Sequence, residues 1–292
     1  MFIIKYKSLF IGVAVAMVVA SIILVAHFGI KKGVDFTGGT VVEITYTVHD
    51  NPESIGVESF KSEGVKVFKT GETSYKFISE KSYEEVSSTM STLLKKSERP
   101  YIETQVNTVG PTMGKEMTKK ALIAIVIVAI AILGFIAFAF REVSLPVASW
   151  KYGVVAMVTI VHDIIIPTGA YAVLSAWYGA EIDTLFVVAL LTVMAVTISD
   201  KIVVFDRIRE NLKLHGAKRS FDDVVGESLL QTFTRSINTS LTTVLSLIAL
   251  YFFGPEATKF FSLTLIIGIV VGTYSSIFVA SPILTIWNSK RK

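Results

Sequence analysis

The sequence contains no cysteine, and this absence excludes several kinds of site at once. Without thiols there is no disulfide framework, no thiolate metal site and no cysteine nucleophile. No segment matches the phosphate-binding pattern G-x-x-x-x-G-K-[ST], so we do not expect the chain to draw energy from its own nucleotide hydrolysis. Nothing resembles a nucleophile paired with a base or a cluster of metal ligands. We therefore expect no enzyme, no metal site and no bound cofactor.

Charge is also scarce. Charged residues make up 18% of the chain, whereas hydrophobic residues make up 52%, and the mean hydropathy is +0.61. Soluble domains use fewer apolar residues and confine them to short faces. The composition therefore predicts a multi-pass integral membrane protein.

The first long apolar run covers residues 8–30 and follows Lys5 and Lys7. Basic residues before an apolar run are typical of a signal peptide as well as of a membrane anchor. The run is longer than the apolar region of a signal peptide, and no small-residue cleavage site follows it. We therefore interpret residues 1–30 as the N-terminus and a retained first transmembrane helix.

Five further apolar runs follow a polar region, and residues 121–292 are expected to form a five-helix membrane domain. Each run is about 20 residues long or longer, which is enough to cross a bilayer as a helix. The predicted transmembrane helices cover residues 121–140, 154–177, 184–205, 235–253 and 260–287. Between the fourth and fifth runs we expect a long loop, 206–234, in which Ser220 and Asp223 start an amphipathic helix at 221–230.

Residues 31–120 differ from the rest because they are polar and carry charges of both signs. Segments rich in β-branched residues predict strands, and apolar residues spaced by three and four predict helices. The order β-α-β-β-α-β is that of a ferredoxin-like α+β domain. The predicted segments are a strand at 41–48, a helix at 53–62, strands at 65–70 and 75–79, a helix at 83–95 and a strand at 102–109.

The distribution of Lys and Arg predicts the orientation in the membrane. The N-terminus, the segments 141–153 and 206–235, and the C-terminus are all basic, whereas 178–183 and 254–259 hold one Lys between them. Basic segments stay on the cytoplasmic side. Both termini are therefore expected in the cytoplasm of a cell-membrane protein, with the domain 31–120 on the extracytoplasmic side.

Three polar sites interrupt the apolar runs. Asp200 lies in the predicted fourth helix, with Thr197 one turn before it, and an acid there costs about 2.5–3.5 kcal/mol on insertion scales. Arg235 heads the predicted fifth helix and is followed on one face by Asn238 and Thr242. His162 and Asp163 form the third site, inside the predicted third helix.

An acid, a cation and hydroxyl groups on neighbouring helices are what a proton path needs. The acid takes up and releases the proton, the cation neutralises the ionised acid, and the hydroxyls hold water. Each group also has a purely structural interpretation. Asp200 can pair with Lys201 or an Arg, Arg235 can extend to the interface, the hydroxyls can join helices, and His162 with Asp163 can form a packing hydrogen bond.

The sequence resembles the SecF branch of the SecD/SecF family of protein-export membrane proteins, within the resistance-nodulation-division superfamily. The resemblance rests on Asp200 and on motifs in order along the whole chain: GVDFTGGT at 33–40, VHD at 161–163, VVFDRIREN at 203–211, QT at 231–232, RS at 235–236, TSLTT at 239–243 and GTYSSIFVA at 272–280. Taken jointly, these motifs are highly specific.

The resemblance implies a six-helix protein that works with the related protein SecD. It implies that the pair assists the SecYEG channel late in protein export, pulling on the unfolded polypeptide with energy from the proton gradient. By the same resemblance, Asp200 and Arg235 correspond to the family's intramembrane proton path. The sequence departs from the family in one respect: Ser199 and Lys201 flank the acid where Asn and Thr or Ser are common.

Two other functions fit the same features. An exporter of lipids or small molecules in the same superfamily usually carries two six-helix halves, whereas this chain has one and no obvious internal repeat. A scaffold that stabilises a translocon without transporting ions is favoured by Lys201, because a cation beside Asp200 stabilises the charged carboxylate and opposes its protonation.

Overall fold

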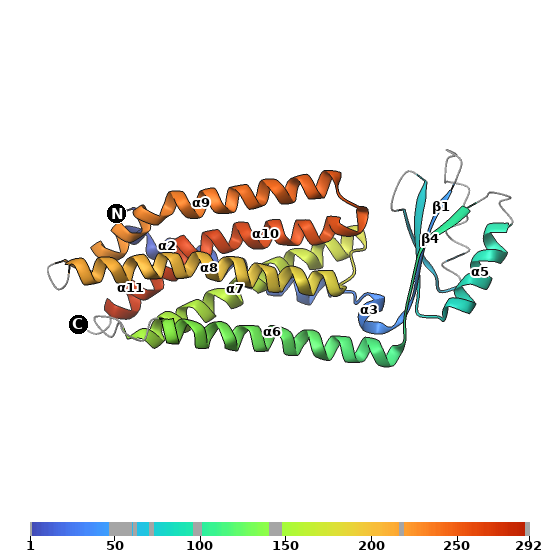
Figure 1. Ribbon diagram of the computed structural model, residues 1–292, viewed down its shortest axis with the longest axis horizontal. Helices are drawn as coiled ribbons and strands as arrows, with labels where there is room; N and C mark the ends of the chain where they lie inside the picture. Colours follow the sequence, from blue (N-terminus) through green and yellow to red (C-terminus); the bar gives the residue numbers. More distant parts are fainter. Residues whose placement is uncertain are drawn as a thin grey trace. The chain divides into compact units, whose positions relative to one another are not determined.

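A computed structural model describes residues 2–46, 60, 63–69, 73–95, 101–139, 148–215 and 219–289. The chain divides into two compact units. The membrane unit comprises Met1–Lys31, Ala124–Ala180 and Leu185–Lys292, and the α/β unit comprises Lys32–Ile123 and Glu181–Thr184. Long helices make up the first unit, and a small sheet lies in the second (Figure 1).

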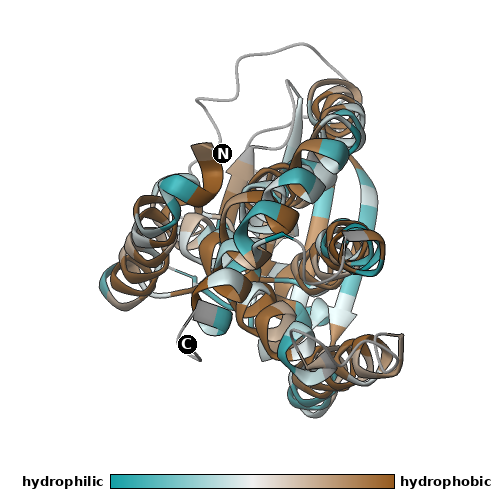
Figure 2. Ribbon diagram, turned by 90° about the vertical axis from the view of Figure 1, so that its left-hand side faces the viewer, coloured by the Kyte–Doolittle hydropathy of each residue, from teal (hydrophilic) through white to brown (hydrophobic). Residues whose placement is uncertain are grey.

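Six helical segments among the described residues are long and apolar enough to cross a membrane. Figure 2, which looks along the helices, shows that apolar residues predominate on them. The helices are α2 (Lys7–Phe28, after the short α1, Phe2–Lys5), α6 (Pro111–Ala139), α7 (Ser149–Tyr178), α8 (Thr184–His215), α9 (Phe221–Phe253), and α10 (Lys259–Ser275) with its continuation. That continuation is a π-helical turn, Ser276–Ala280, followed by α11 (Ser281–Ser289), and the short helix Glu256–Thr258 precedes α10.

Helices α7, α8 and α10 form the centre of the membrane unit and run side by side (Figure 1). About half of the residues of these three spans are buried, whereas α2, α6 and α9 leave most of their residues exposed. Two glycines explain how closely α10 approaches α8. A Cβ atom on Gly268 would overlap Val193, and one on Gly272 would overlap Thr197. Small residues at such contacts let helix backbones come close in a membrane.

The prediction for 206–234 is confirmed in one part and wrong in another: a helix does start after Ser220, but most of the remaining segment is helical as well and does not form a loop. Helix α8 runs on to His215, and α9 begins at Phe221, where the Ser220 hydroxyl accepts a hydrogen bond from the Asp223 backbone N–H. Both extensions bury apolar side chains, and the Asn211 side-chain amide donates to the Ser228 hydroxyl at 2.8 Å, so they stabilise each other as helices. The buried side chains are Phe205, Ile208, Leu212, Val224, Val225 and Leu229.

The α/β unit has the predicted ferredoxin-like order. Its sheet has the strand order β2-β3-β1-β4 with antiparallel neighbours, and α5 (Tyr83–Lys95) lies on one face (Figure 1). The strands are β1 (Gly39–Tyr46), β2 (Lys66–Lys69), β3 (Ser74–Ser79) and β4 (Tyr101–Val109). Of the helix predicted at 53–62, only Phe60 lies within the described residues, and it is helical and buried.

Alternate residues of the strands build the core of this unit, as the period of two in a strand requires. The core side chains are Val42, Ile44, Phe60, Val65, Tyr75, Phe77, Val86 and Met90. Burial raises the pKa of the Tyr75 hydroxyl. Two of the motif glycines have positive φ angles before and at the start of β1, with 82° at Gly38 and 136° at Gly39. A Cβ atom on Gly39 would overlap the Ser79 carbonyl, so only glycine fits there.

The segment 181–184 is held by the α/β unit through several contacts. The Gly33 backbone N–H donates to the Ile182 carbonyl at 2.8 Å. Asp35, in the short helix α3 (Val34–Thr37), accepts hydrogen bonds from the backbone N–H and the hydroxyl of Thr184, at 3.0 and 2.8 Å. Asp35 thus gives the backbone N–H of Thr184, within the same unit, a hydrogen-bond partner.

We expect Gly272→Ala to destabilise the membrane unit. The added methyl group overlaps Thr197 of α8, and overpacking of this kind costs about 1–3 kcal/mol. Gly134→Ala in α6 is the matched control, because a Cβ atom there meets nothing within 4 Å. The measurement is the free energy of unfolding of each variant in detergent micelles. Equal stability of the two variants would show that α10 and α8 do not need this close contact.

Candidate functional site

A lysine and an aspartate form an ion pair in the centre of the membrane unit. Lys201 of α8 donates from Nζ to Oδ2 of Asp163 on α7 at 2.6 Å, and both side chains are 0% exposed. Each residue lies in the apolar part of its helix, where an unpaired charge would be costly. A buried ion survives in such a place only when a partner neutralises it and satisfies its hydrogen bonds. The pair therefore joins α7 to α8.

His162 completes this group from the other side of the carboxylate. Its Nδ1 lies 3.0 Å from Oδ1 of Asp163, and its side chain is buried. An ionised carboxylate can only accept hydrogen bonds, so Nδ1 carries a hydrogen and its N–H donates a hydrogen bond to Asp163. In the neutral imidazole, the other nitrogen, Nε2, then bears a lone pair. Nε2 is buried and has no hydrogen-bond partner among the residues that the structure describes.

Hydroxyl groups surround the charged group. The Ser275 hydroxyl of α10 donates to the Gly272 carbonyl of its own helix at 3.0 Å and also interacts electrostatically with Asp163. Lys201 Nζ also lies 3.4 Å from the backbone carbonyl of Thr197, and the Thr197 hydroxyl is buried without a partner within the described part of the chain. Directly after Ser275 the helix makes its π-helical turn, Ser276–Ala280. Such turns displace the helix register locally and are frequent at functional sites.

Asp200 occupies a different position from its neighbour Lys201. Its side chain is only half-buried, and its electrostatic partners are Lys201, Ser240 and Arg235, the last two on α9. No ion pair within 4.0 Å joins the described side chains of Asp200 and Arg235. The carboxylate of Asp200 therefore faces α9, whereas the charge of Lys201 faces α7.

The polar residues predicted along one face of the fifth membrane helix lie on α9, and their side chains are exposed rather than packed against another helix. Arg235, Asn238 and Thr242 are all exposed, and the Thr242 hydroxyl donates only to carbonyls of its own helix, those of Asn238 and Thr239. Thr197, which was expected beside Asp200, is buried against Gly272 and contacts Lys201.

Sequence reasoning did not identify Lys201 as the partner of Asp163. It named His162 and Asp163 as one pair and treated Lys201 only as a neighbour of Asp200. A signal for the correct pairing was available: opposite charges in two successive apolar helices joined by a tight loop must find partners, and the nearest are each other. The contribution of Ser275 had no such signal, because it depends on the position of α10.

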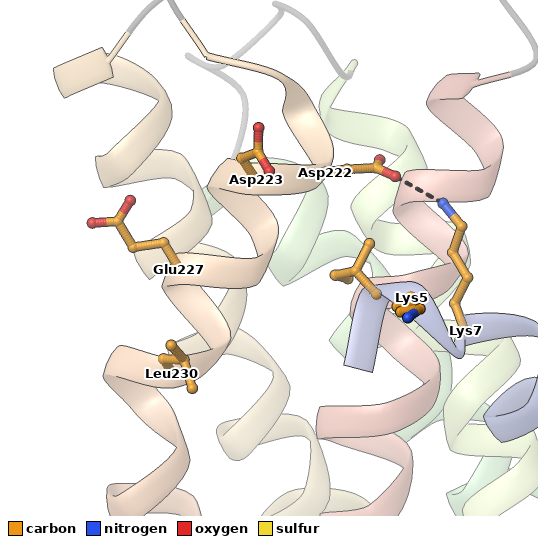
Figure 3. Close-up of a pocket in the computed structure, with 7 residues that line it drawn as sticks. Lys5, Lys7, Asp222, Asp223, Glu227 and Leu230 are labelled. Atoms are coloured by element: carbon orange, nitrogen blue, oxygen red, sulfur yellow. Dashed lines mark hydrogen bonds and ion pairs between the residues drawn. The ribbon is translucent and has the colours of Figure 1, made fainter. Parts of the chain in front are cut away.

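A separate depression of about 580 Å³, lined by charged and apolar residues, lies where α1, α2 and α9 begin (Figure 3). Lys7 donates from Nζ to Asp222 at 2.9 Å and to the Thr285 hydroxyl at 3.1 Å, so it ties the start of α2 to α9 and α11. The charges at this depression have both signs and it is open to solvent, which fits a structural contact between helix ends. The lining residues are Ile4, Lys5, Lys7, Asp222, Asp223, Glu227 and Leu230.

We expect Lys201→Met and Asp163→Asn each to destabilise the protein by about 3–5 kcal/mol, because each leaves a buried group without its partner. The double variant removes both charges and should lose much less than the sum of the two single losses. The measurement is a double-mutant cycle on the free energy of unfolding in micelles. Strictly additive losses would mean that the two side chains do not stabilise the fold as a pair.

Comparison with known proteins places this chain in a family. The family profile described as "Protein export membrane protein SecD/SecF, C-terminal" matches residues 79–290, and the profile described as "SecD/SecF GG Motif" matches residues 23–47. The protein translocase subunit SecF of Thermobaculum terrenum is 38% identical, and the match covers 99% of this chain and 94% of that protein. The SecF subunit of Anaerolinea thermophila is 33% identical, with 97% and 92% covered.

Solved structures agree with this result. The crystal structure of SecDF from a Thermus species superimposes with a TM-score of 0.83 at 29% identity, covering 99% of this chain but only 38% of that chain. A second crystal structure of SecDF, in the super-membrane-facing form, gives a TM-score of 0.69 at 30% identity. This chain therefore spans about two-fifths of the solved SecDF chains, while it matches the SecF relatives over nearly their whole length. The chain belongs to the SecD/SecF family of protein-export membrane proteins.

Proposed function

We propose that this chain is an auxiliary subunit of the Sec protein-export machinery that acts with SecD to assist late translocation through the SecYEG channel. The observation that carries the proposal is the match over nearly the full length of proteins named protein translocase subunit SecF. In this role the substrate is an unfolded polypeptide in transit. The chain forms and breaks no covalent bonds in that substrate, so the role is one of movement rather than enzymatic catalysis.

The exposed polar residues on α9 support SecD as the partner in the membrane. Hydrocarbon cannot satisfy the hydrogen bonds of Arg235 or Asn238, so an exposed polar stripe on a membrane helix needs a protein or water beside it. Large apolar side chains on α9 are exposed as well, including Leu241 and Leu245. The longer SecDF relatives contain a match to this chain in only part of their length, which leaves room for a SecD part in the same polypeptide.

A cross-linking experiment tests this interface directly, because the chain has no cysteine of its own. We expect Asn238→Cys on α9 to form a disulfide with cysteines scanned along the membrane helices of SecD. Ile130→Cys, on the exposed face of α6, is the control and should cross-link much less. The measurement is the yield of the cross-linked pair in native membranes. Equal yields from both positions would argue against α9 as the docking helix.

We further propose that the proton gradient drives the movement and that both termini lie in the cytoplasm. The basic segments next to the predicted membrane helices support this orientation, which puts the α/β unit outside. Protonation of groups near Asp200 and Arg235 would change the balance between two arrangements of the membrane unit. The α/β unit would then move about its two connections, residues 31–38 and 110–120.

Asp200→Asn separates a titrating role of this carboxylate from a packing role. We expect the variant to co-purify with SecD but to slow the late export of a reporter protein to the rate seen when an uncoupler collapses the proton gradient. The amide keeps the size of the side chain and one oxygen acceptor, but it replaces the other oxygen with an NH2 donor and cannot change its charge. Ser199→Ala, at an exposed neighbouring position, is the control and should export normally.

Normal export by Asp200→Asn would show that Asp200 is a packing residue. A scaffold role in the translocon would then be the better account of this chain. That role already has one observation in its favour, since the buried pair Lys201–Asp163 joins two helices whether or not it titrates.

A further inference from the structure

The carboxylate of Asp163 has two cationic or potentially cationic neighbours, one on each oxygen. Lys201 Nζ occupies Oδ2 at 2.6 Å, and His162 Nδ1 occupies Oδ1 at 3.0 Å. One carboxylate neutralises one cation. With Lys201 charged and His162 neutral, the group as a whole carries no net charge, which is the favourable state for a fully buried site.

The free lone pair on His162 Nε2 makes this group able to bind a proton. Because Nδ1 donates to Asp163, the neutral ring presents Nε2 as an acceptor, and no described residue donates to it. A buried acceptor without a partner costs free energy. A proton at Nε2 would turn this acceptor into a donor, which needs an acceptor such as a water molecule beside the ring. Imidazole is the side chain that most readily exchanges protons near neutral pH.

We propose that His162 is a second proton-binding residue of this chain's membrane unit, beside Asp200, and that protonation of His162 while Asp200 is ionised displaces Lys201 from Asp163. The proposal rests on the proton-linked function proposed above and names the residues that perform it. One proton binds the Nε2 lone pair and forms an N–H bond, while no other covalent bond changes. The imidazolium then neutralises Asp163 through its existing contact. Lys201 keeps its three protons and its charge, but Asp163 attracts it less strongly.

The charged groups around the site determine where Lys201 can go. Two adjacent cations and one anion would leave an excess positive charge in the buried layer, which favours movement of Lys201 toward another anion. Asp200 precedes Lys201 on α8, its side chain is half-buried, and its carboxylate lies within the electrostatic influence of the Lys201 charge. Protonation would therefore move the lysine from the α7 side of α8 toward the α9 side, where Arg235 also faces Asp200.

Other helices contribute no competing charge at this level within the described residues. From α10 and the π-helical turn the neighbours are the hydroxyls of Ser275 and Ser276. Tyr274, also on α10, donates its hydroxyl to the Phe10 carbonyl of α2 instead. The ionisable side chains of α2, Lys7 and His27, lie in its first and last turns. The exchange therefore involves His162, Asp163, Lys201 and Asp200, with Arg235 next to Asp200.

Nuclear magnetic resonance of the ring nitrogens tests proton binding without relying on export. The chain has four histidines, so labelling histidine with ¹⁵N and comparing the complex with its His162→Asn variant assigns the signal of His162. We expect Nε2 to change from a lone-pair to an N–H signal as the pH falls, while Nδ1 stays protonated. In Lys201→Met, the cation that competes for Asp163 is gone, so the pH dependence of this signal should differ from that of the unmodified complex.

A functional test uses two amides in place of the imidazole. Asn at position 162 places a donor near the position of Nδ1, so it can keep the contact with Asp163 but cannot bind a proton. We expect His162→Asn to assemble with SecD and to export slowly, with no further slowing by an uncoupler. Gln places its amide near the position of Nε2 and loses the contact with Asp163, so His162→Gln should reduce the stability of the complex as well.

Each outcome separates this inference from the proposed function. If an uncoupler does not slow export by the unmodified complex, the proton-linked function itself is wrong. If the uncoupler slows export by the unmodified complex and equally by His162→Asn, the function stands and His162 is not one of its proton-binding residues. A His162 signal that does not change with pH, or that binds protons equally well in Lys201→Met, would also overturn the exchange.

Discussion

Two charges placed inside an apolar layer can remain there only if each neutralises the other. Lys201 and Asp163 do so at 2.6 Å with no exposure to solvent, and the arrangement of the three central helices depends on this contact. Helix α7 and helix α8 must meet at that level, and α10 must come close enough to bring Ser275 to the same carboxylate. Gly272 permits the approach, since a side chain there would overlap Thr197. The glycine and the ion pair therefore act at the same level: Gly272 lets α10 approach α8, and the ion pair joins α8 to α7.

Helix α8 carries adjacent residues of opposite charge that face different neighbours. Successive residues on a helix point about 100° apart, so Lys201 can be sealed against α7 while Asp200 remains half-open toward α9. The closed side satisfies its hydrogen bonds largely within this chain. On the side that faces α9, Arg235 and Asn238 are exposed, and within the described residues their hydrogen bonds are not satisfied by other helices of this chain. A partner protein in the membrane would satisfy them. The separation gives one helix both an internal and an external polar contact.

The order of the α/β unit and the number of apolar helices could be predicted from the sequence, because both follow from local patterns. Strand alternation at Val42 and Ile44 and helical spacing at Val86 and Met90 are visible within a few residues. The prediction of a loop at 206–234 was wrong because helix formation there depends on packing between distant segments, such as the burial of Ile208 against α9. The pairing of Lys201 with Asp163 was missed for the same kind of reason: contacts across 38 residues depend on which helices are neighbours. Asp200 is recognisable in the sequence as an acid inside an apolar run, although the more deeply buried acid is Asp163.

The buried pair also constrains how the chain enters the membrane during its synthesis. Helix α7 ends at Tyr178 and α8 begins at Thr184, so only a short turn separates the two spans. Inserted one at a time, each helix would carry its own charge into the hydrocarbon, at about 2.5–3.5 kcal/mol on insertion scales. Inserted together as a hairpin, the two helices carry a pair that is already neutral. The short turn and the buried pair therefore favour insertion of α7 and α8 together over insertion of each helix alone.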